Sequence, residues 1–543
     1  MLTKNQRLNT ECLRLGSELE GVCDAGGMPL FVPGARPGET VDALVVKPQQ
    51  RYAFGKLMQV LTPSPERAEP VCPVYQWCGG CSGQHMTYEA TLKAKRAQVL
   101  DCLNRIGGLN LSEDQVPSVL GAENPWRFRN KTALPVQGTA QEPQIGFYRR
   151  RSHAIVPVED CPITMGPLSE VLAAVKEWMR AARVQPYQEE TGKGLLRHVV
   201  VRTSRAGALM VLLVATKPQL PGVDRLIDRL KAIPGFTTLV VNINKQRNNV
   251  ILGRECQVLH GDGVIYETLL GLTFEISPLS FFQVNPPQTE RLYQTAIDFA
   301  GLTGNELVVD AYAGAGTIAL CMARNAKRVI GIEIVEPAVD SARRNAERNG
   351  ITNAEFHAAA VEDLLPKLVA DGLRPDVIML DPPRKGVEPQ VIEAVLKAAP
   401  RKVVYVSCHV PTQARDLQML AQGGYRFEGC QPVDMFCYAG GVENVVVLSK
   451  INTPQHIDID LDLSELDVTR AESKGTYQEI KDYVLEHFGL KVSTLYIAQV
   501  KQKHGIIERE CYNAPKTEGG RVPQCPKEKM EAIEEALRFF KMI

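Results

Sequence analysis

The sequence has no excess of charge, because 62 Lys and Arg residues are matched by 62 Asp and Glu residues among 543. Bulk attraction to a polyanion is therefore absent, and any nucleic-acid surface must be a local basic patch. No apolar run approaches the length of a membrane span, and the N-terminus (Met1 to Glu11) lacks the hydrophobic core of a signal peptide. We therefore expect a cytoplasmic protein with no membrane partner.

The spacing of a small disulfide scaffold is also missing, although the chain holds 14 cysteines. Without an export signal, such cysteines are thiols, metal ligands or nucleophiles. A chain of 543 residues is too long for one hydrophobic core, so three or four domains are expected.

The clearest pattern lies between Val308 and Leu320, where an apolar strand ends in an acid, turns through glycines and becomes a helix. Glu333 ends the next strand roughly 20 residues later, the spacing of a carboxylate that receives ribose hydroxyls. The third glycine of the dinucleotide fingerprint is absent. Asp310-x-Tyr312-x-Gly-x-Gly followed by Gly-x-Glu resembles a class I (Rossmann-like) S-adenosylmethionine methyltransferase, an α/β fold. A doubly wound domain for another nucleotide is the alternative.

Three later segments bring chemistry to the same predicted sheet edge. Asp381 begins Asp-Pro-Pro-Arg384, whose tandem prolines force an extended turn where ligands bind. Arg384 stands where amino-methyltransferases carry an aromatic residue, which counts against an exocyclic amine as target. Cys408 ends the next strand and Glu443 precedes the last one. A lone strand-end cysteine is more often a buried small residue, but this shared edge makes Cys408 a candidate nucleophile.

Residues 1–65 alternate β-branched and polar residues between glycine and proline turns, which predicts a small barrel. The phrase Phe31-Val-Pro-Gly-Ala-Arg-Pro-Gly-Glu39 resembles the turn of a TRAM domain, an OB-like RNA-binding barrel. A barrel that only packs is the alternative.

A thiolate-held metal is predicted next, because Cys72, Cys78 and Cys81 fall within ten residues with two glycines to bend the chain. Cys161 is the best candidate for the fourth ligand. Zinc and a [4Fe-4S] cluster share these ligands, so the spacing alone does not separate them.

Two segments mix cations with aromatics, Trp126 to Lys131 and Phe147 to His153. Arginines neutralise phosphates while aromatic faces stack on unpaired bases. We expect these segments to bind RNA; a solvated charge run is the alternative.

Taken together, these motifs resemble the RNA uracil-5-methyltransferase family, and the barrel and cysteine set resemble its RumA-type 23S ribosomal RNA branch. The resemblance covers roughly Met1 to Lys450. It implies that S-adenosylmethionine is held by Gln283, Tyr312, Glu333 and Asp381. It further implies Cys408 as the nucleophile, Glu443 as the base, and a [4Fe-4S] cluster on Cys72, Cys78, Cys81 and Cys161.

The implied chemistry is reasonable from first principles. C5 of uracil is a poor nucleophile, and a thiolate that adds at C6 moves electron density onto C5. After methyl transfer, a carboxylate removes the C5 proton and the thiolate leaves. A base within a helix is inaccessible, so the target uridine must be unpaired or flipped out.

Two departures from the family lie beside the proposed nucleophile and base. His409-Val410-Pro-Thr412 replaces the usual Asn-Pro-x-Thr, and Gly441 stands where His is common. They put substrate choice or rate in doubt more than reaction type.

We therefore expect a barrel over 1–65, a central mixed α+β domain with the cluster over 66–274, the methyltransferase domain over 275–450 and a helical extension of unknown role over 454–543. The enzyme is expected to act as a monomer on 23S ribosomal RNA. A tRNA-directed enzyme of the same family, and an iron–sulfur RNA-binding protein without catalysis, are the alternatives.

Overall fold

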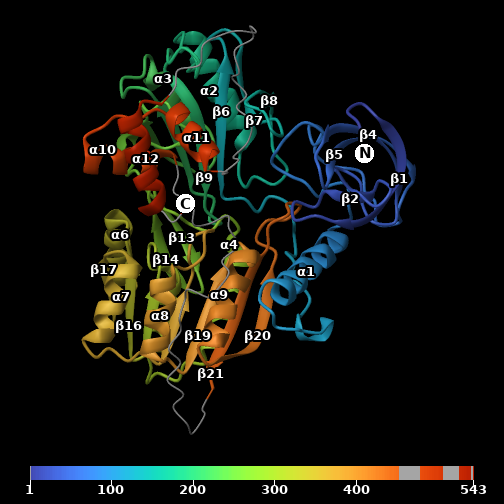
Figure 1. The fold of residues 1–543 in the computed structure, drawn as a ribbon. Helices are drawn as coiled ribbons and strands as arrows, with labels where there is room; N and C mark the ends of the chain where they lie inside the picture. Colours follow the sequence, from blue (N-terminus) through green and yellow to red (C-terminus); the bar gives the residue numbers. More distant parts are fainter. Residues whose placement is uncertain (1, 452–476, 505–524, 540–541, 543) are drawn as a thin grey trace. The chain divides into compact units, whose positions relative to one another are not determined.

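The computed structural model describes residues 2–451, 477–504, 525–539 and 542, and the chain divides into two compact units, Met1–Asn452 and Thr453–Ile543 (Figure 1). Each unit has a hydrophobic core of its own among the described residues. Within the described ranges, none of the helices has the length and apolar character needed to cross a bilayer.

The N-terminal strands form a closed five-stranded barrel in the order β1-β2-β3-β5-β4, which confirms the predicted barrel. All pairs are antiparallel except β3 with β5. Small and β-branched side chains fill the interior, because alternate residues of each strand point inward. The strands are β1 (Arg7–Leu15), β2 (Gly21–Asp24), β3 (Pro29–Val32), β4 (Thr40–Pro48) and β5 (Ala53–Thr62).

A mixed seven-stranded sheet follows, in the order β12-β11-β10-β9-β6-β7-β8. Its strands are β6 (Lys131–Gly138), β7 (Pro143–Tyr148), β8 (Ile155–Pro157), β9 (Leu196–Thr203), β10 (Leu209–Ala215), β11 (Phe236–Ile243) and β12 (Glu255–His260), and its helices are α2 (Leu168–Ala181) and α3 (Val223–Lys231). Val199 and Val201 pack under α2 and α3, whereas Val200 faces the opposite way into the core that contains α4. Strands β9 and β10 are buried along their whole length because both faces are covered.

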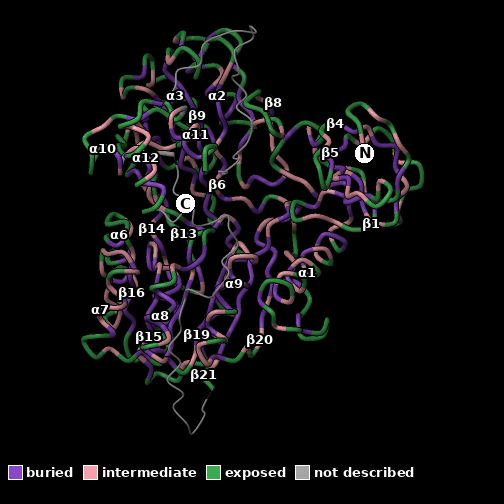
Figure 2. The backbone as a smooth tube through the Cα atoms, viewed as in Figure 1, coloured by how far each residue is buried: buried purple, intermediate pink, exposed green. Residues whose placement is uncertain are grey.

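The hairpin of β13 (Ile265–Leu269) and β14 (Leu272–Ile276) leads into a second seven-stranded sheet, in the order β17-β16-β15-β18-β19-β21-β20. It is parallel except for β21, which runs antiparallel to both neighbours. Its strands are β15 (Leu307–Ala311), β16 (Arg328–Glu333), β17 (Ala354–Ala358), β18 (Val377–Leu380), β19 (Lys402–Ser407), β20 (Tyr425–Val433) and β21 (Glu443–Lys450). Its central strands are buried (Figure 2).

Helices cover both faces of this sheet, because alternate strand residues belong to two different hydrophobic clusters. On one face lie α4 (Pro286–Ala300), α5 (Thr317–Ala323) and α6 (Glu336–Arg348). On the other lie α7 (Val361–Ala370), α8 (Pro389–Ala398), α9 (Val410–Gln422) and α1 (Tyr88–Arg105). A 3-10 turn, η1 (Glu113–Gln115), follows α1 in the chain. Helix α1 belongs by sequence to the 66–274 segment, yet it packs on the methyltransferase sheet beside α9.

A buried ion pair fixes α1 in that place. Lys95 Nζ donates to the Asp434 carboxylate and to the Phe436 carbonyl (2.9 Å), and Tyr88 donates its hydroxyl to Asp434 Oδ2 (2.6 Å). The side chains of Lys95 and Asp434 are fully buried. Residues more than 300 positions apart are thereby joined beside the start of β21.

The described residues of the second unit form α10 (Tyr477–Phe488), α11 (Thr494–Lys503) and α12 (Lys527–Phe539). Their shared core includes Val484, Ile497, Val500, Ile533 and Leu537. The linker after Thr453 and most of the loop expected over 515–526 lie outside the described residues.

Candidate active site

Four side chains predicted to share one sheet edge do so. Strands β15, β16, β18 and β19 are parallel and in register, so their carboxyl ends lie together. Asp310 is the penultimate residue of β15 and Glu333 is the last residue of β16. Asp381 and Cys408 directly follow β18 and β19. This is the edge at which parallel α/β sheets bind ligands.

Glu443 reaches the same edge from the opposite chain direction. Strand β21 is antiparallel to β19, and the pairing of Ser407 with Asn444 brings Cys408 and Glu443, the next residue on each strand, face to face. Cys408 is half-buried and Glu443 is 2% exposed. The predicted convergence of a thiol and a carboxyl at one point of the edge is thus present.

Burial raises the pKa of both carboxyl groups at this point. The pKa of Glu443 rises to about 8, first through burial and then through the neighbouring Asp381, against the opposing effect of Arg384. The pKa of Asp381 rises to about 7 through burial alone. Such shifts are typical of acid–base groups that work near neutral pH.

Arg384 has a role that the sequence did not reveal. Burial and Glu443 raise the pKa of the Cys408 thiol, and a hydrogen bond and the charge of Arg384 act to lower it. The Arg384 carbonyl accepts a hydrogen bond from Thr412 Oγ1 (3.1 Å), which ties the Asp-Pro-Pro-Arg turn to the first turn of α9. A cation beside a thiol favours the thiolate, the reactive form. The only sequence signal was a basic residue in an aromatic position.

The glycine-rich turn after β15 is shaped to receive a ligand. Tyr312, which is half-buried, has a φ of 77°, and its backbone N–H donates to the Ile332 carbonyl (3.0 Å). The Glu333 carboxylate accepts from the backbone N–H of Gly314 (3.0 Å) and Val335 (2.8 Å). A carboxylate offers about four acceptor positions, so Glu333 is held in place and can still accept ribose hydroxyls.

The surroundings of Asp310 bear on whether this edge suits S-adenosylmethionine. Asp310 is 1% exposed, and among the described residues neither carboxylate oxygen has a hydrogen-bond partner. Burial, Asp381 and Glu333 raise its pKa well above the ordinary value. A buried acid without partners calls for a ligand that donates hydrogen bonds, and the ammonium group of S-adenosylmethionine fits. Gln283 is buried in the loop before α4, and its backbone carbonyl accepts a hydrogen bond from Asn130 Nδ2 (2.9 Å).

The two departures beside Cys408 and Glu443 have local structural reasons. His409 is the N-cap of α9, and its Nδ1 lies 3.0 Å from Thr412 Oγ1. At Gly441 an added Cβ would lie 3.2 Å from Phe436 Cδ2. The glycine therefore leaves room for a neighbouring aromatic ring.

The four predicted metal-ligand cysteines lie near enough for Cys161 to act electrostatically on the other three. Burial raises the pKa of Cys72, Cys78 and Cys81, and the charge of Cys161 raises it further by a smaller amount. The pKa of Cys81 reaches about 12. Arg150 donates to the carbonyls of Cys78 and Cys81. Within the described part of the chain, however, no three His, Cys, Asp or Glu side chains could hold a metal ion.

The predicted aromatic–basic segments are used partly for packing. Trp126 stacks on Tyr438, with ring centroids 4.5 Å apart, and Phe128 is buried. One face of the Trp126 ring and the buried Phe128 ring are therefore used for packing within the protein and are not free to stack on RNA bases. Burial, with Arg202 and Arg129 nearby, lowers the pKa of Lys131 to about 8.

The fold and this edge define an S-adenosylmethionine-dependent methyltransferase. Residues 270–451 match the family model of tRNA (Uracil-5-)-methyltransferase. An uncharacterized RNA methyltransferase of Clostridium tetani is 42% identical over 82% of this chain and 97% of its own length. One of Listeria innocua is 43% identical over 83% and 99%. The chain belongs to the RNA uracil-5-methyltransferase family, whose substrate is RNA.

A solved structure agrees over the same extent. The Pyrococcus abyssi tRNA (uracil-54, C5)-methyltransferase in complex with S-adenosyl-L-homocysteine is 26% identical with a TM-score of 0.66, and the match covers 81% of this chain and 100% of that one.

Proposed function

We propose that this enzyme transfers a methyl group from S-adenosylmethionine to C5 of a uridine in 23S ribosomal RNA through a covalent Cys408–C6 adduct, with Glu443 as the base. The observation that carries the proposal is the facing position of Cys408 and Glu443 across β19 and β21. A catalytically silent RNA-binding protein would need neither residue there, nor Arg384 beside the thiol.

Each step can be assigned to a side chain of this edge. Bound S-adenosylmethionine supplies the electrophilic methyl group. The thiolate of Cys408, which Arg384 stabilises against the larger opposing effect of burial, adds to C6 of uracil. The electron pair of the C5–C6 bond then forms an enolate that takes the methyl at C5. Glu443 then accepts the C5 proton, the C5–C6 double bond re-forms and the Cys408 thiolate leaves. The products are 5-methyluridine and S-adenosylhomocysteine.

Gln283, Tyr312, Glu333 and Asp381 are proposed to hold the methyl donor. The support comes from the fixed Glu333 carboxylate, the shaped turn at Tyr312 and the unpartnered Asp310 carboxylate in the same pocket.

We further propose that Cys72, Cys78, Cys81 and Cys161 hold a [4Fe-4S] cluster, with zinc as the alternative. Thiolates hold both zinc and iron–sulfur clusters, and the support for a thiolate-held group is that Cys161 acts on the pKa of the other three thiols. Among the described residues no three such side chains form a ready metal site.

The target RNA is the finer part of the proposal. The barrel, which resembles a TRAM module, and the cysteine set favour 23S ribosomal RNA, acted on by a monomer. The Pyrococcus enzyme is named for tRNA, and its match covers 81% of this chain. That is more than the methyltransferase and central sheets span together. We therefore keep tRNA as the second candidate substrate. Mapping 5-methyluridine in ribosomal and transfer RNA from cells with and without the gene separates the two.

The catalytic assignment is tested by two substitutions. Cys408→Ala should abolish 5-methyluridine formation, whereas Glu443→Gln should accumulate a covalent protein–RNA adduct that survives a denaturing gel. Cys256→Ala, at an exposed thiol away from the edge, is the matched control and should keep wild-type turnover. Wild-type turnover by the Cys408 variant would refute the mechanism.

A further inference from the structure

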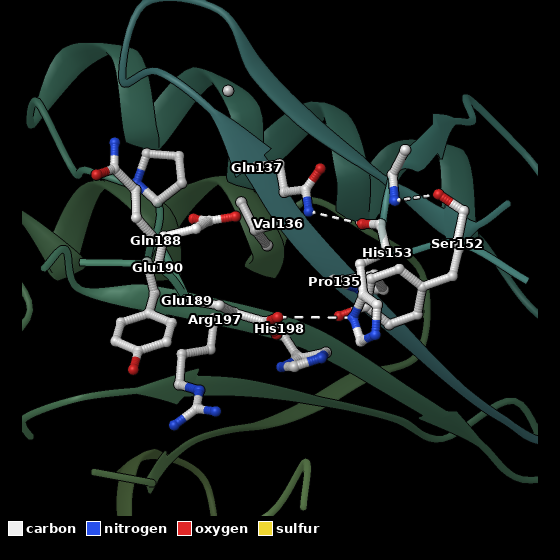
Figure 3. Close-up of a pocket in the computed structure, with 15 residues that line it drawn as sticks. Pro135, Val136, Gln137, Ser152, His153, Gln188, Glu189, Glu190, Arg197 and His198 are labelled. Carbon is white, nitrogen blue, oxygen red and sulfur yellow. Dashed lines mark hydrogen bonds and ion pairs between the residues drawn. The ribbon is translucent and has the colours of Figure 1, made fainter. Parts of the chain in front are cut away.

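A cavity of about 500 Å³ lies in the central sheet and shares no lining residue with the active-site edge (Figure 3). Three segments enclose it: the end of β6 from Pro135 to Gly138, the turn from Pro186 to Glu190, and the loop from Ser152 to Ala154 beside Tyr148. Its floor is formed by Arg197 and His198 of β9. This cavity is called the bulge pocket below.

A β-bulge explains how two successive strand residues line one cavity. Against β10, His198 pairs with Val214 and Leu196 pairs with Ala215, so Arg197 is the extra, unpaired residue. Adjacent residues of a regular strand point to opposite faces, and a bulge re-aims one of them. Such bulges are frequent next to functional sites.

The floor carries polar atoms that the protein leaves unused. Arg197 is 5% exposed and His198 is 6% exposed, yet Arg197 Nε and His198 Nδ1 have no hydrogen-bond partner among the described residues. Arg197 is otherwise held firmly, with Nη1 donating to the carbonyls of Asn244 (3.1 Å) and Gln246 (2.6 Å). Buried polar atoms are normally satisfied, and these two unsatisfied nitrogens belong to residues that line one cavity, although the atoms themselves are shielded from solvent.

The walls are aromatic and the rim is acidic. Arg197 lies over the Tyr187 ring at 4.5 Å, and the rings of Tyr148 and His153 stand edge to face at 5.6 Å. Glu189, 3.6 Å from His153 Nδ1, projects from the neighbouring turn beside Glu190. Aromatic faces suit a nucleobase, whereas two carboxylates disfavour a phosphate inside the cavity.

We propose that the bulge pocket binds an unpaired guanine nucleotide of the RNA substrate. Guanine offers acceptors, O6 and N7, for the Arg197 and His198 side, and N–H groups of its opposite edge for the carboxylates of the rim. The exposed Arg149 and Arg151, next along the chain from the wall residue Tyr148, are placed to neutralise the flanking phosphates. The inference rests on the proposed action on RNA.

Burial and the neighbouring Arg197 lower the pKa of His198 to about 4, so its imidazole is neutral at physiological pH. A neutral imidazole can accept a hydrogen bond on one nitrogen and donate on the other, which suits a base edge.

The experiment uses the full-length protein and RNA in which 6-thioguanosine replaces guanosine, either as 23S ribosomal RNA or as tRNA transcripts. Irradiation should cross-link the RNA to the peptides that carry Tyr148 or Tyr187, and 5′-GMP at millimolar concentration should compete while 5′-UMP should not. No cross-link in the wild type, or equal competition by 5′-UMP, would overturn the proposal.

Ala154→Trp places a large side chain in the pocket while leaving the other lining residues unchanged. Ala232 is exposed at the end of α3 in the same domain, so Ala232→Trp is the matched control. The first should remove the cross-link and raise the Kd for RNA roughly tenfold, the loss of about one stacked base, while the second should leave both unchanged. A second variant, Glu189→Gln, changes only an exposed side chain and should weaken competition by 5′-GMP.

Unchanged cross-linking in Ala154→Trp, or unchanged competition by 5′-GMP in Glu189→Gln, would refute the bulge pocket. Failure of the methylation proposal is read separately, as absence of 5-methyluridine from wild-type reactions on either RNA.

Discussion

Glu443 is a buried carboxyl group, and burial sets the pH range in which it could accept the proton that the proposed mechanism assigns to it. Its pKa of about 8, and the raised pKa of Cys408 beside it, mean that both groups hold their protons at neutral pH in the free enzyme. Asp381 reinforces this, while Arg384 opposes it. Proton affinity at this edge is therefore set by four side chains together.

We predict that kcat/KM for RNA methylation rises with pH between 6.5 and 8.5. A base with a pKa of about 8 is mostly protonated at the lower value and mostly ionised at the higher one, so the rise should be roughly tenfold or more. Initial rates measured in buffers of constant ionic strength check this. A profile that is flat over this range would contradict the role of Glu443 as base.

The same shift predicts how stability depends on pH. Because the folded-state pKa of Glu443 lies above its unfolded value, its contribution is fully present below about pH 4.5 and is lost as pH rises through about 8. Glu443→Gln removes this loss and should be more stable than the wild type by a few kcal/mol at pH 9, with little difference at pH 5. Urea unfolding at both pH values measures it; an equal difference at both would contradict the shift.

At the scale of elements, the turn from β15 into α5 depends on one close approach. Gly316 has a φ of 77°, and an added Cβ would lie 2.9 Å from both Ala342 of α6 and Phe356 of β17. The glycine therefore permits the backbone conformation and allows α5 to begin against its neighbours.

Gly316→Ala should lower the free energy of unfolding by roughly 2–3 kcal/mol, the sum of left-handed strain and overpacking, and should weaken binding of S-adenosylhomocysteine measured by calorimetry. Gly350→Ala is the control, since Gly350 has a φ of 65° with open space around its Cβ position. It should lose only about 1 kcal/mol and bind normally. Equal losses in both variants would show that close packing at Gly316 is unimportant.

A second test concerns the attachment of α1. Lys95→Met leaves the buried Asp434 without its cation and should cost roughly 3–5 kcal/mol. Lys93→Met is the control, because Lys93 is 75% exposed where it meets Glu66 and should cost less than about 1 kcal/mol. Denaturant unfolding of the two variants compares them directly; similar costs would argue against α1 being anchored by the buried pair.

The sequence predicted the catalytic edge well for a physical reason. Strand-end residues such as Asp381 and Cys408 must meet when the strands are parallel, so chain order alone brings them together. The sequence could not predict the β-bulge at Arg197, because a bulge depends on the register between β9 and β10. Nor could it predict that Trp126 stacks on Tyr438, since that contact joins residues far apart in the chain.

At the scale of the molecule, the central and methyltransferase sheets of the first unit are joined by a shared core, whereas the barrel has a core of its own. Val200 of the central sheet belongs to the same hydrophobic cluster as Leu292 of α4 and Val308 of β15. The described helices of the second unit have a hydrophobic core of their own.

Deletion of residues 453–543 should therefore leave the unfolding midpoint of the remaining body unchanged, because no described core residue of that body is removed. Differential scanning calorimetry of the truncated and full-length chains tests this, and a large drop in the midpoint would show that the second unit supports the first. RNA affinity of the same pair separates an RNA-gripping role of the extension, which lowers affinity on deletion, from a docking role, which does not.

The doubly covered strands β9 and β10 have a mechanical consequence. Swinging the central sheet away from the methyl-transfer edge would expose the apolar side chains that both share, at a cost that grows with every ångström of opening. If RNA occupies both the edge and the bulge pocket as proposed, the protein fixes the span between them. Selectivity among RNAs is then set by how easily each one can be bent and unstacked to match that span.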